Sequence, residues 1–154
     1  MTIRELQKKI ADALNGVEAL VQGGCKAFPE DTREIYGESN QWISGGKVAL
    51  VVVTPDFERT GSGTEDALPA EGDLLIRCVE RVPLSRENPA VIRALDAAQI
   101  VAHTLDGETL EWKSIRQTID QRNSTITATV TFGFDIAVKQ SQNIPYDNYL
   151  DSLQ

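Results

Sequence analysis

The sequence predicts an α+β domain, a two-layer sandwich in which two amphipathic helices pack on one face of a mainly antiparallel sheet. Three observations predict it: a long alternating strand at residues 123–139, two segments with helical periodicity, and β-branched runs between them. The predicted order is helix, strand, strand, helix, strand, strand, which suits a two-layer sandwich. We expect one domain over residues 1–139 and a polar C-terminal tail over residues 140–154.

The amino-acid composition and net charge argue against several classes of function. The chain has 154 residues, of which 41% are hydrophobic and 25% charged, as in an ordinary globular domain with its own core. Its net charge of −8 argues against tight nucleic-acid binding through phosphates, which requires clustered lysine and arginine. No apolar run approaches the roughly 18 residues that span a bilayer. We therefore expect neither a specific nucleic-acid partner nor a membrane partner.

The first predicted helix begins near the N-terminus. Its apolar positions are spaced alternately by three and four residues, which is the stripe of an amphipathic helix: Ile3, Leu6, Ile10, Ala13, Val17 and Leu20. Thr2 and Glu5 form a capping-box pattern, and Gly23 with Gly24 ends the helix. The stripe covers only about three heptads, so packing on a sheet is favoured over a coiled coil.

The next part of the chain combines strands with an apparent loop. Residues 27–46 mix charged and apolar side chains and predict short turns with one short edge strand. Residues 47–54 are a β-branched run without alternation, typical of a central strand covered on both faces. Residues 56–72 are rich in Gly, Thr, acids and Pro, and predict a long flexible loop. Residues 73–82 predict a second strand, antiparallel to the preceding one.

The second predicted helix follows a connector at residues 83–89. Asn88 is a suitable N-cap and Pro89 a suitable first helical residue. Apolar residues then recur at helical spacing until Asp106 and Gly107 end the helix: Val91, Leu95, Ala98, Ala102 and Leu105.

The last two strands are separated by a turn at residues 121–124. In the strand at 109–119, the apolar residues change parity midway, so we expect a β-bulge near Lys113 and Ser114. In the final strand every even position from Ile126 to Val138 is apolar, whereas the odd positions include four threonines. This alternation predicts one buried face and one half-exposed face.

A search for chemistry yields no convergent set of titratable groups. The only histidine, His103, has no indicated partner, and there is neither a Cys-x-x-Cys pair nor a second histidine for a metal. Cys78 follows the parity of core residues, and two free thiols are favoured over a disulfide between Cys25 and Cys78. Arg81, Arg86 and Arg93 are interleaved with acids, which favours salt bridges over anion binding. We therefore expect no catalytic, metal or cofactor site.

One segment resembles a known family. The stretch IRCVERVPLSRENPAVIRALDAAQIVAHTL is similar to the strand, connector and helix of bacteriophage tail terminator and minor tail (tail-completion) proteins. The match is carried by Val82, Arg86, Glu87, Asn88, Pro89, Arg93 and the helix that follows. The resemblance implies a non-enzymatic assembly protein that forms a ring, a hexamer, capping the tail tube and joining it to the neck. It also implies tail-tube and neck proteins as partners, and a location in the virion or, during assembly, in the bacterial cytoplasm.

The resemblance gives several surfaces a possible role in subunit or partner contacts. Acidic side chains of the 56–72 segment would line a channel that DNA crosses with little adhesion: Glu58, Glu65, Asp66 and Glu71. The other candidates are two arginines, two threonines of the final strand and two tyrosines of the tail: Arg86, Arg93, Thr127, Thr129, Tyr146 and Tyr149. Two alternatives stay open: a domain that binds a small molecule or peptide between sheet and helix, and a small hydrolase using Cys25.

Overall fold

Two long antiparallel strands form the middle of a six-stranded sheet. In the computed structural model, β6 (Thr125–Lys139) pairs along its whole length with β4 (Ala67–Arg81). The strand order is β1-β2-β4-β6-β5, and β3 pairs with β4 next to β2. The structure describes residues 2–30, 35–62, 67–82 and 88–139. The predicted α+β class and mainly antiparallel sheet are confirmed.

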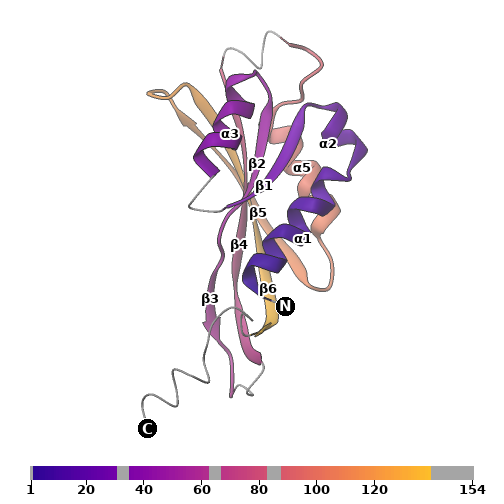
Figure 1. Cartoon of the computed structure of the whole chain (residues 1–154), viewed down its shortest axis with the longest axis vertical. Helices are drawn as coiled ribbons and strands as arrows, with labels where there is room; N and C mark the ends of the chain where they lie inside the picture. The colour runs from indigo at the N-terminus through magenta and orange to yellow at the C-terminus, as the bar shows by residue number, and fades with distance from the viewer. Residues whose placement is uncertain (1, 31–34, 63–66, 83–87, 140–154) are drawn as a thin grey trace.

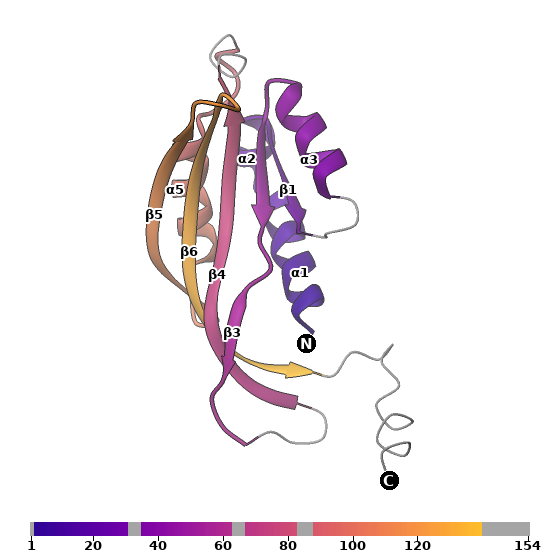
Figure 2. The ribbon, with the colours of Figure 1, turned by 90° about the vertical axis from the view of Figure 1, so that its left-hand side faces the viewer.

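The remaining strands are shorter and lie toward the two sides of the sheet. β1 runs parallel to β2, and the other pairs are antiparallel. Figure 2 shows that the ends of β4 and β6, together with β3, reach past the layer of helices. The strands are β1 (Cys25–Pro29), β2 (Val48–Val52), β3 (Asp56–Arg59) and β5 (Leu110–Asp120).

Helices cover the two faces of the sheet unequally (Figure 1). Helices α1, α2 and α5 lie on one face, whereas α3 lies on the other, beside β1 and β2. No described helix is long and apolar enough to cross a membrane. The helices are α1 (Ile3–Asn15), α2 (Glu18–Gln22), α3 (Ile35–Ser44) and α5 (Ala94–Leu105).

The main core lies between the sheet and the α1–α2–α5 layer. α1 contributes Leu6, Ile10 and Leu14, and α5 contributes small residues that let it approach the sheet closely. The even positions of β6 face this core and are buried: Ile126, Ala128, Val130, Phe132 and Phe134. The odd positions from Thr125 to Gly133 are half-buried. The predicted alternation of the final strand is thus confirmed, as is the buried central strand β2.

The predicted first helix is interrupted. Its capping box is present, since the Thr2 amide donates to Glu5 Oε2 and the Glu5 amide to Thr2 Oγ1. However, α1 ends at Asn15, and Gly16 is its C-cap. The Asn15 side chain instead forms two hydrogen bonds with the backbone of Ala27, at 2.8 and 3.1 Å. These bonds tie the end of α1 to β1, so the sequence between them turns and resumes as α2.

Helix α3 is an element that the sequence analysis missed. It packs with Trp42 and Ile43 on a small second cluster with Phe28, Ala49 and Val79. The Trp42 indole donates to the carbonyl oxygens of Gly24 and Val48, at 3.2 and 2.9 Å. Because α3 contacts so small a cluster, few of its positions need to be apolar. Its sequence therefore lacks the regular spacing of apolar residues that would have predicted a helix. The edge strand predicted in the same segment is β1.

The predicted loop at 56–72 is wrong. β3 occupies Asp56–Arg59, and β4 begins at Ala67, well before the predicted strand start at residue 73. Position 72 of β4 requires glycine, because a Cβ there would overlap the carbonyl oxygen of Asp56 in β3. The composition that suggested a loop therefore reflects a close approach of two strands and an acidic surface.

The start of α5 also differs from the prediction. Its N-cap is Arg93, and the Asn88 side chain instead accepts a hydrogen bond from the Ala90 amide in a preceding turn. Residues 83–87 of the predicted connector lie outside the described residues. The predicted end is confirmed, since Asp106 is the C-cap of α5.

The predicted bulge and turn of the last hairpin are confirmed. The pairing of β5 with β6 shifts register between Trp112 and Ser114. In the turn, Asp120 Oδ1 accepts from the amides of Arg122 and Asn123. Hydrogen bonds from Asn123, chiefly from its side chain, hold the pKa of Asp120 below its usual range. Ser124 completes the turn with a positive φ of 54°.

The two faces of β6 predict opposite responses to truncation. Phe132→Ala should lower the free energy of unfolding by about 3–5 kcal/mol, because Phe132 is fully buried in the main core. Thr131→Ala, one residue away on the other face, should cost about 1 kcal/mol or less. Urea denaturation followed by circular dichroism measures both. Equal losses would contradict the assignment of the two faces.

Candidate functional site

The face of the sheet opposite α1 and α5 is covered by α3 over β1, β2 and the part of β4 around Val79, which leaves β6, β5 and the rest of β4 uncovered (Figure 2). We call this surface the free face. Register places its residues in cross-strand rows, because directly paired residues point to the same side. Its residues are Glu71, Asp73, Leu75, Arg77, Thr127, Thr129, Thr131, Gly133, Asp135, Glu111, Ser114, Arg116 and Thr118.

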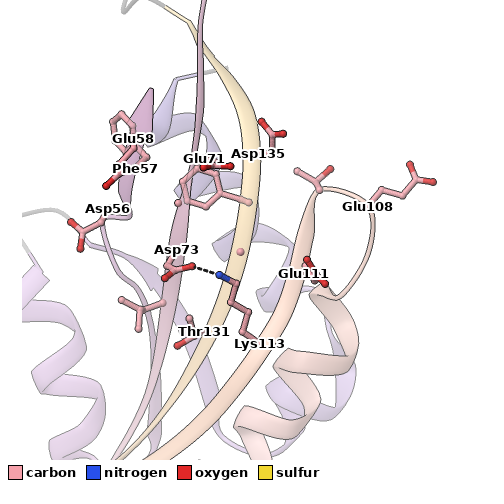
Figure 3. A pocket seen from close by; sticks show the side chains of 15 residues that line it. Asp56, Phe57, Glu58, Glu71, Asp73, Glu108, Glu111, Lys113, Thr131 and Asp135 are labelled. Carbon is pink, nitrogen blue, oxygen red and sulfur yellow. Dashed lines mark hydrogen bonds and ion pairs between the residues drawn. The ribbon is translucent and has the colours of Figure 1, made fainter. Parts of the chain in front are cut away.

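One end of the free face is hollowed into an open groove of about 900 Å³ (Figure 3). Strands β3, β4, β5 and β6 and the segment just before β5 all contribute carboxylates to it. They are Asp56, Glu58, Glu71, Asp73, Glu108, Glu111 and Asp135, with Lys113 as the one lining lysine. Within the described residues, no group of histidine, cysteine and acidic side chains is arranged to hold a metal ion.

Strand register sets carboxylates directly opposite one another in this groove. Glu71 of β4 pairs with Glu58 of β3 on one side and with Asp135 of β6 on the other. Asp56 likewise lies opposite Asp73. Like charges in directly opposed positions destabilise a sheet. The carboxylates in the groove therefore repel one another, and a cationic group placed over them would reduce this repulsion.

Lys113 relieves part of this repulsion from within the chain. Its Nζ lies 2.8 Å from Asp73 Oδ1, and this hydrogen bond is the main reason that the pKa of Lys113 is raised. Both side chains are 52% exposed, so the ion pair stabilises the fold only weakly. A Cβ at Gly133 would lie 2.8 Å from Lys113 Cε, so the glycine leaves room for Lys113 to cross β6.

The structure brings together some of the predicted contact residues. Glu58 and Glu71 line the groove, and Thr127 and Thr129 lie half-buried on the free face. Arg93 is separate from them, since it lies next to α5 and pairs with Glu80. The remaining predicted contact residues lie outside the described residues: Glu65, Asp66, Arg86, Tyr146 and Tyr149.

Glu80 is a buried carboxylate that the sequence analysis did not single out as a site. Its Oε1 accepts from Arg93 Nε at 2.8 Å, and its Oε2 accepts from the Ala94 amide at the start of α5, also at 2.8 Å. Glu80 is 0% exposed and Arg93 43%. The predicted salt bridging among these arginines and acids is confirmed for this pair. The sequence did contain a sign of this burial: Glu80 continues the series of every second residue of β4 that is buried, after Leu74, Ile76 and Cys78.

The two cysteines are buried free thiols, as predicted. Burial raises the pKa of Cys25 to about 12. The pKa of Cys78 is raised as well, by burial first and then by Cys25. A thiol with so high a pKa is protonated near neutral pH and lacks the thiolate that a nucleophilic cysteine needs. This argues against the hydrolase alternative built on Cys25.

A smaller groove lies between α5 and β5, where the binding-domain alternative would place a ligand. Its volume is about 370 Å³, and its lining includes His103 and the half-exposed Trp112. The Trp112 amide donates to Asp106 Oδ1 at 3.0 Å, which fixes the start of β5 against the end of α5. His103 is exposed on α5.

Comparison with known proteins shows a shared fold. A chain in a solved structure described as "Virion of native gene transfer agent (GTA) particle" superposes with a TM-score of 0.55 at 14% sequence identity. The match covers 86% of this chain and 94% of that chain. No family model matches the sequence, and no curated protein matches it. The two chains therefore share nearly their whole architecture despite low sequence identity.

The buried thiols predict low reactivity in the folded protein. A disulfide reagent at mildly alkaline pH should modify Cys25 and Cys78 on the order of 1000-fold more slowly than in denaturant, because burial suppresses the thiolate. The absorbance of the released thiol measures the rate. Modification of Cys25 in the native protein at the denatured rate would contradict this account.

Proposed function

We propose that the chain is a non-enzymatic structural subunit of a phage-type particle, a tail terminator or tail-completion protein. The observation that carries this proposal is the fold shared with a chain of the gene transfer agent virion, over 86% of this chain and 94% of that chain. The segment from Ile76 to Leu105, which resembles tail terminator and minor tail proteins, supports the same assignment independently of the fold.

The proposed mechanism is geometric. Six copies form a closed ring that covers the end of the tail tube, stops its growth and offers a new surface to the neck. A ring of identical subunits requires head-to-tail contacts, in which two different patches of each copy meet. Its partners are copies of itself and the tail-tube and neck proteins. It acts in the virion and, during assembly, in the bacterial cytoplasm.

The acidic groove supports a role beside a DNA path. Glu58 and Glu71 of the predicted channel lie together there, with further carboxylates from β5 and β6. A surface with this charge repels phosphates, so DNA would pass it without adhering. In this proposal the β3 side of each subunit faces the axis of the ring.

Electron microscopy of the purified full chain tests the ring. Class averages are expected to show closed rings with six-fold symmetry in projection. Particles of one or two subunits at every concentration would contradict the proposal, whereas rings with another number of subunits would retain the assembly role and correct the hexamer.

The threonine side of the free face gives a mutational prediction. Thr127→Lys with Thr129→Lys should leave the protein folded, because the apolar even face of β6 is unchanged. The mass of the assembled particle should fall, since charge is introduced where another subunit packs. Circular dichroism reports the fold and light scattering the mass. An unchanged mass would show that these threonines face only solvent and that the subunit contact lies elsewhere.

A further inference from the structure

A strip of exposed apolar side chains runs along the groove between α5 and β5. Its members are Leu95, which is 39% exposed, Trp112 at 46% and Ile119 at 65%. Trp112 lines the groove, and Ile119 shares its face of β5, because each pairs with a buried even residue of β6. Leu95 precedes the lining residue Gln99 by about one turn of α5, so both lie on the same side of the helix. The strip thus extends the groove toward the start of α5 and the end of β5.

The strip is exposed because no element of the described residues covers the outer side of β5. β5 is the last strand of the sheet, and α5 packs over β4, β6 and β5 together. Ile115 contacts the main core and is half-buried, whereas Trp112 and Ile119 stay exposed. Single exposed apolar residues are common on protein surfaces, but several around one groove indicate a site where another segment packs.

The sequence that follows β6 contains a segment that fits this groove. Residues 140–154 carry large apolar or aromatic side chains at positions i, i+3, i+4 and i+7: Tyr146, Tyr149, Leu150 and Leu153. This spacing predicts an amphipathic helix, with Pro145 in its first turn. As a helix this stripe would be about 10 Å long, and the α5 side of the groove, from Leu95 to Asp106, is about 16 Å long.

The chemistry of the stripe also suits the groove. Ala102 and Ile115 form an apolar floor, and the exposed Gln99 and His103 form a polar rim. A tyrosine ring can pack on such a floor while its hydroxyl group finds a hydrogen-bond partner at the rim. An amphipathic helix whose apolar side lies in a groove is a recurring mode of peptide recognition.

The end of β6 decides which copy supplies this segment. β6 ends at Lys139, seven residues beyond Phe132, the partner of Trp112, and therefore about 24 Å from that row along the strand. Seven fully extended residues span at most about 25 Å, so they would only just bring Tyr146 to the near end of the chain's own groove. Figure 2 also shows the end of β6 bending across β4 to the side of α1, away from β5. This arrangement favours the groove of a neighbouring copy.

We propose that residues 144–153 form an amphipathic helix that docks in the α5–β5 groove of a neighbouring copy. Each copy then supplies one tail and one groove, two different patches, as the head-to-tail contacts of a ring require. Docking of this kind rests on the proposed assembly, for which it supplies a contact between subunits. The groove lies on the α5 side of β5, so a docked tail leaves the free face accessible to the body of another subunit.

Complementary variants of the full chain test this contact. Tyr149→Glu with Leu150→Glu disables the tail, and Trp112→Glu with Ile119→Glu disables the groove. Either variant alone should weaken assembly about 100-fold or more, because docking would bury the introduced carboxylates. An equimolar mixture should form particles of two copies, since the intact tail of one variant fits the intact groove of the other and no further tail contact remains. Sedimentation velocity measures the masses, and circular dichroism reports whether each variant is folded.

Val21→Glu with Phe57→Glu is the matched control for the groove variant. It also replaces one β-branched and one aromatic side chain that are about half exposed, but both lie outside the groove. This control should assemble like the wild type. The proposal is overturned if the tail variant or the groove variant assembles normally, or if their mixture stays unpaired.

A fluorescent peptide with the sequence of residues 140–154 separates this proposal from the ring. The tail variant should bind the peptide, which raises its fluorescence anisotropy, and a chain that also carries the groove substitutions should bind about 100-fold more weakly. Peptide binding and pairing in the mixture, without closed rings of the wild type, would refute the ring alone. Rings in every variant, without peptide binding, would refute tail docking alone. Peptide binding without pairing in the mixture would show that the tail occupies its own groove, which contradicts docking between copies.

Discussion

The pairing of β4 with β6 is the constraint on which the rest of the structure depends. Alternation along both strands buries Phe132 and Val130 against Leu74 and Ile76. A slip of one residue would send these side chains to the other face, so the hydrophobic effect fixes the register. The same register fixes the free face, because it decides which charged residues lie in one row. The core thereby determines a surface pattern that its own packing does not require.

Glu80 adds a second, polar constraint on how the helix layer sits. Its carboxylate accepts hydrogen bonds from Arg93 and from the first amide of α5. A single residue of β4 thus fixes the position of the start of that helix. Removing one partner of a buried charge pair is costly, because the other charge is left without compensation. The pair therefore favours one placement of α5, and with it the small residues that let α5 lie close to the sheet.

The sequence was informative where local chemistry decided the structure. The alternation of β6, the bulge after Trp112 and the capping box at Thr2 all depend on side chains close together in the chain. The break after Asn15 depends instead on hydrogen bonds to Ala27, and the strand character around Gly72 depends on the approach of β3. Such tertiary effects leave no periodic signal, so α3 and β3 were missed.

The candidate surface was predictable only in part, for the same reason. Glu58, Glu71, Thr127 and Thr129 were expected at contacts, and the structure places all four on the face that α1 and α5 leave uncovered. The proximity of Arg77 and Arg116 on the free face was not expected. Arg77 and Arg116 lie on strands far apart in the sequence, and they share a row only because β6 lies between them. The pattern within one strand shows which residues share a face of the sheet. It does not show which residues of different strands become neighbours.

The most direct test of the account is the mobility of a probe on the free face before and after assembly. A spin label at Thr118→Cys stands on the free face directly opposite Thr127, and the buried native thiols should stay unlabelled. Electron paramagnetic resonance is expected to show that the label loses mobility when rings assemble, because the proposed subunit contact covers Thr127 and its neighbours. A label that stays equally mobile in assembled rings would contradict subunit packing on the free face.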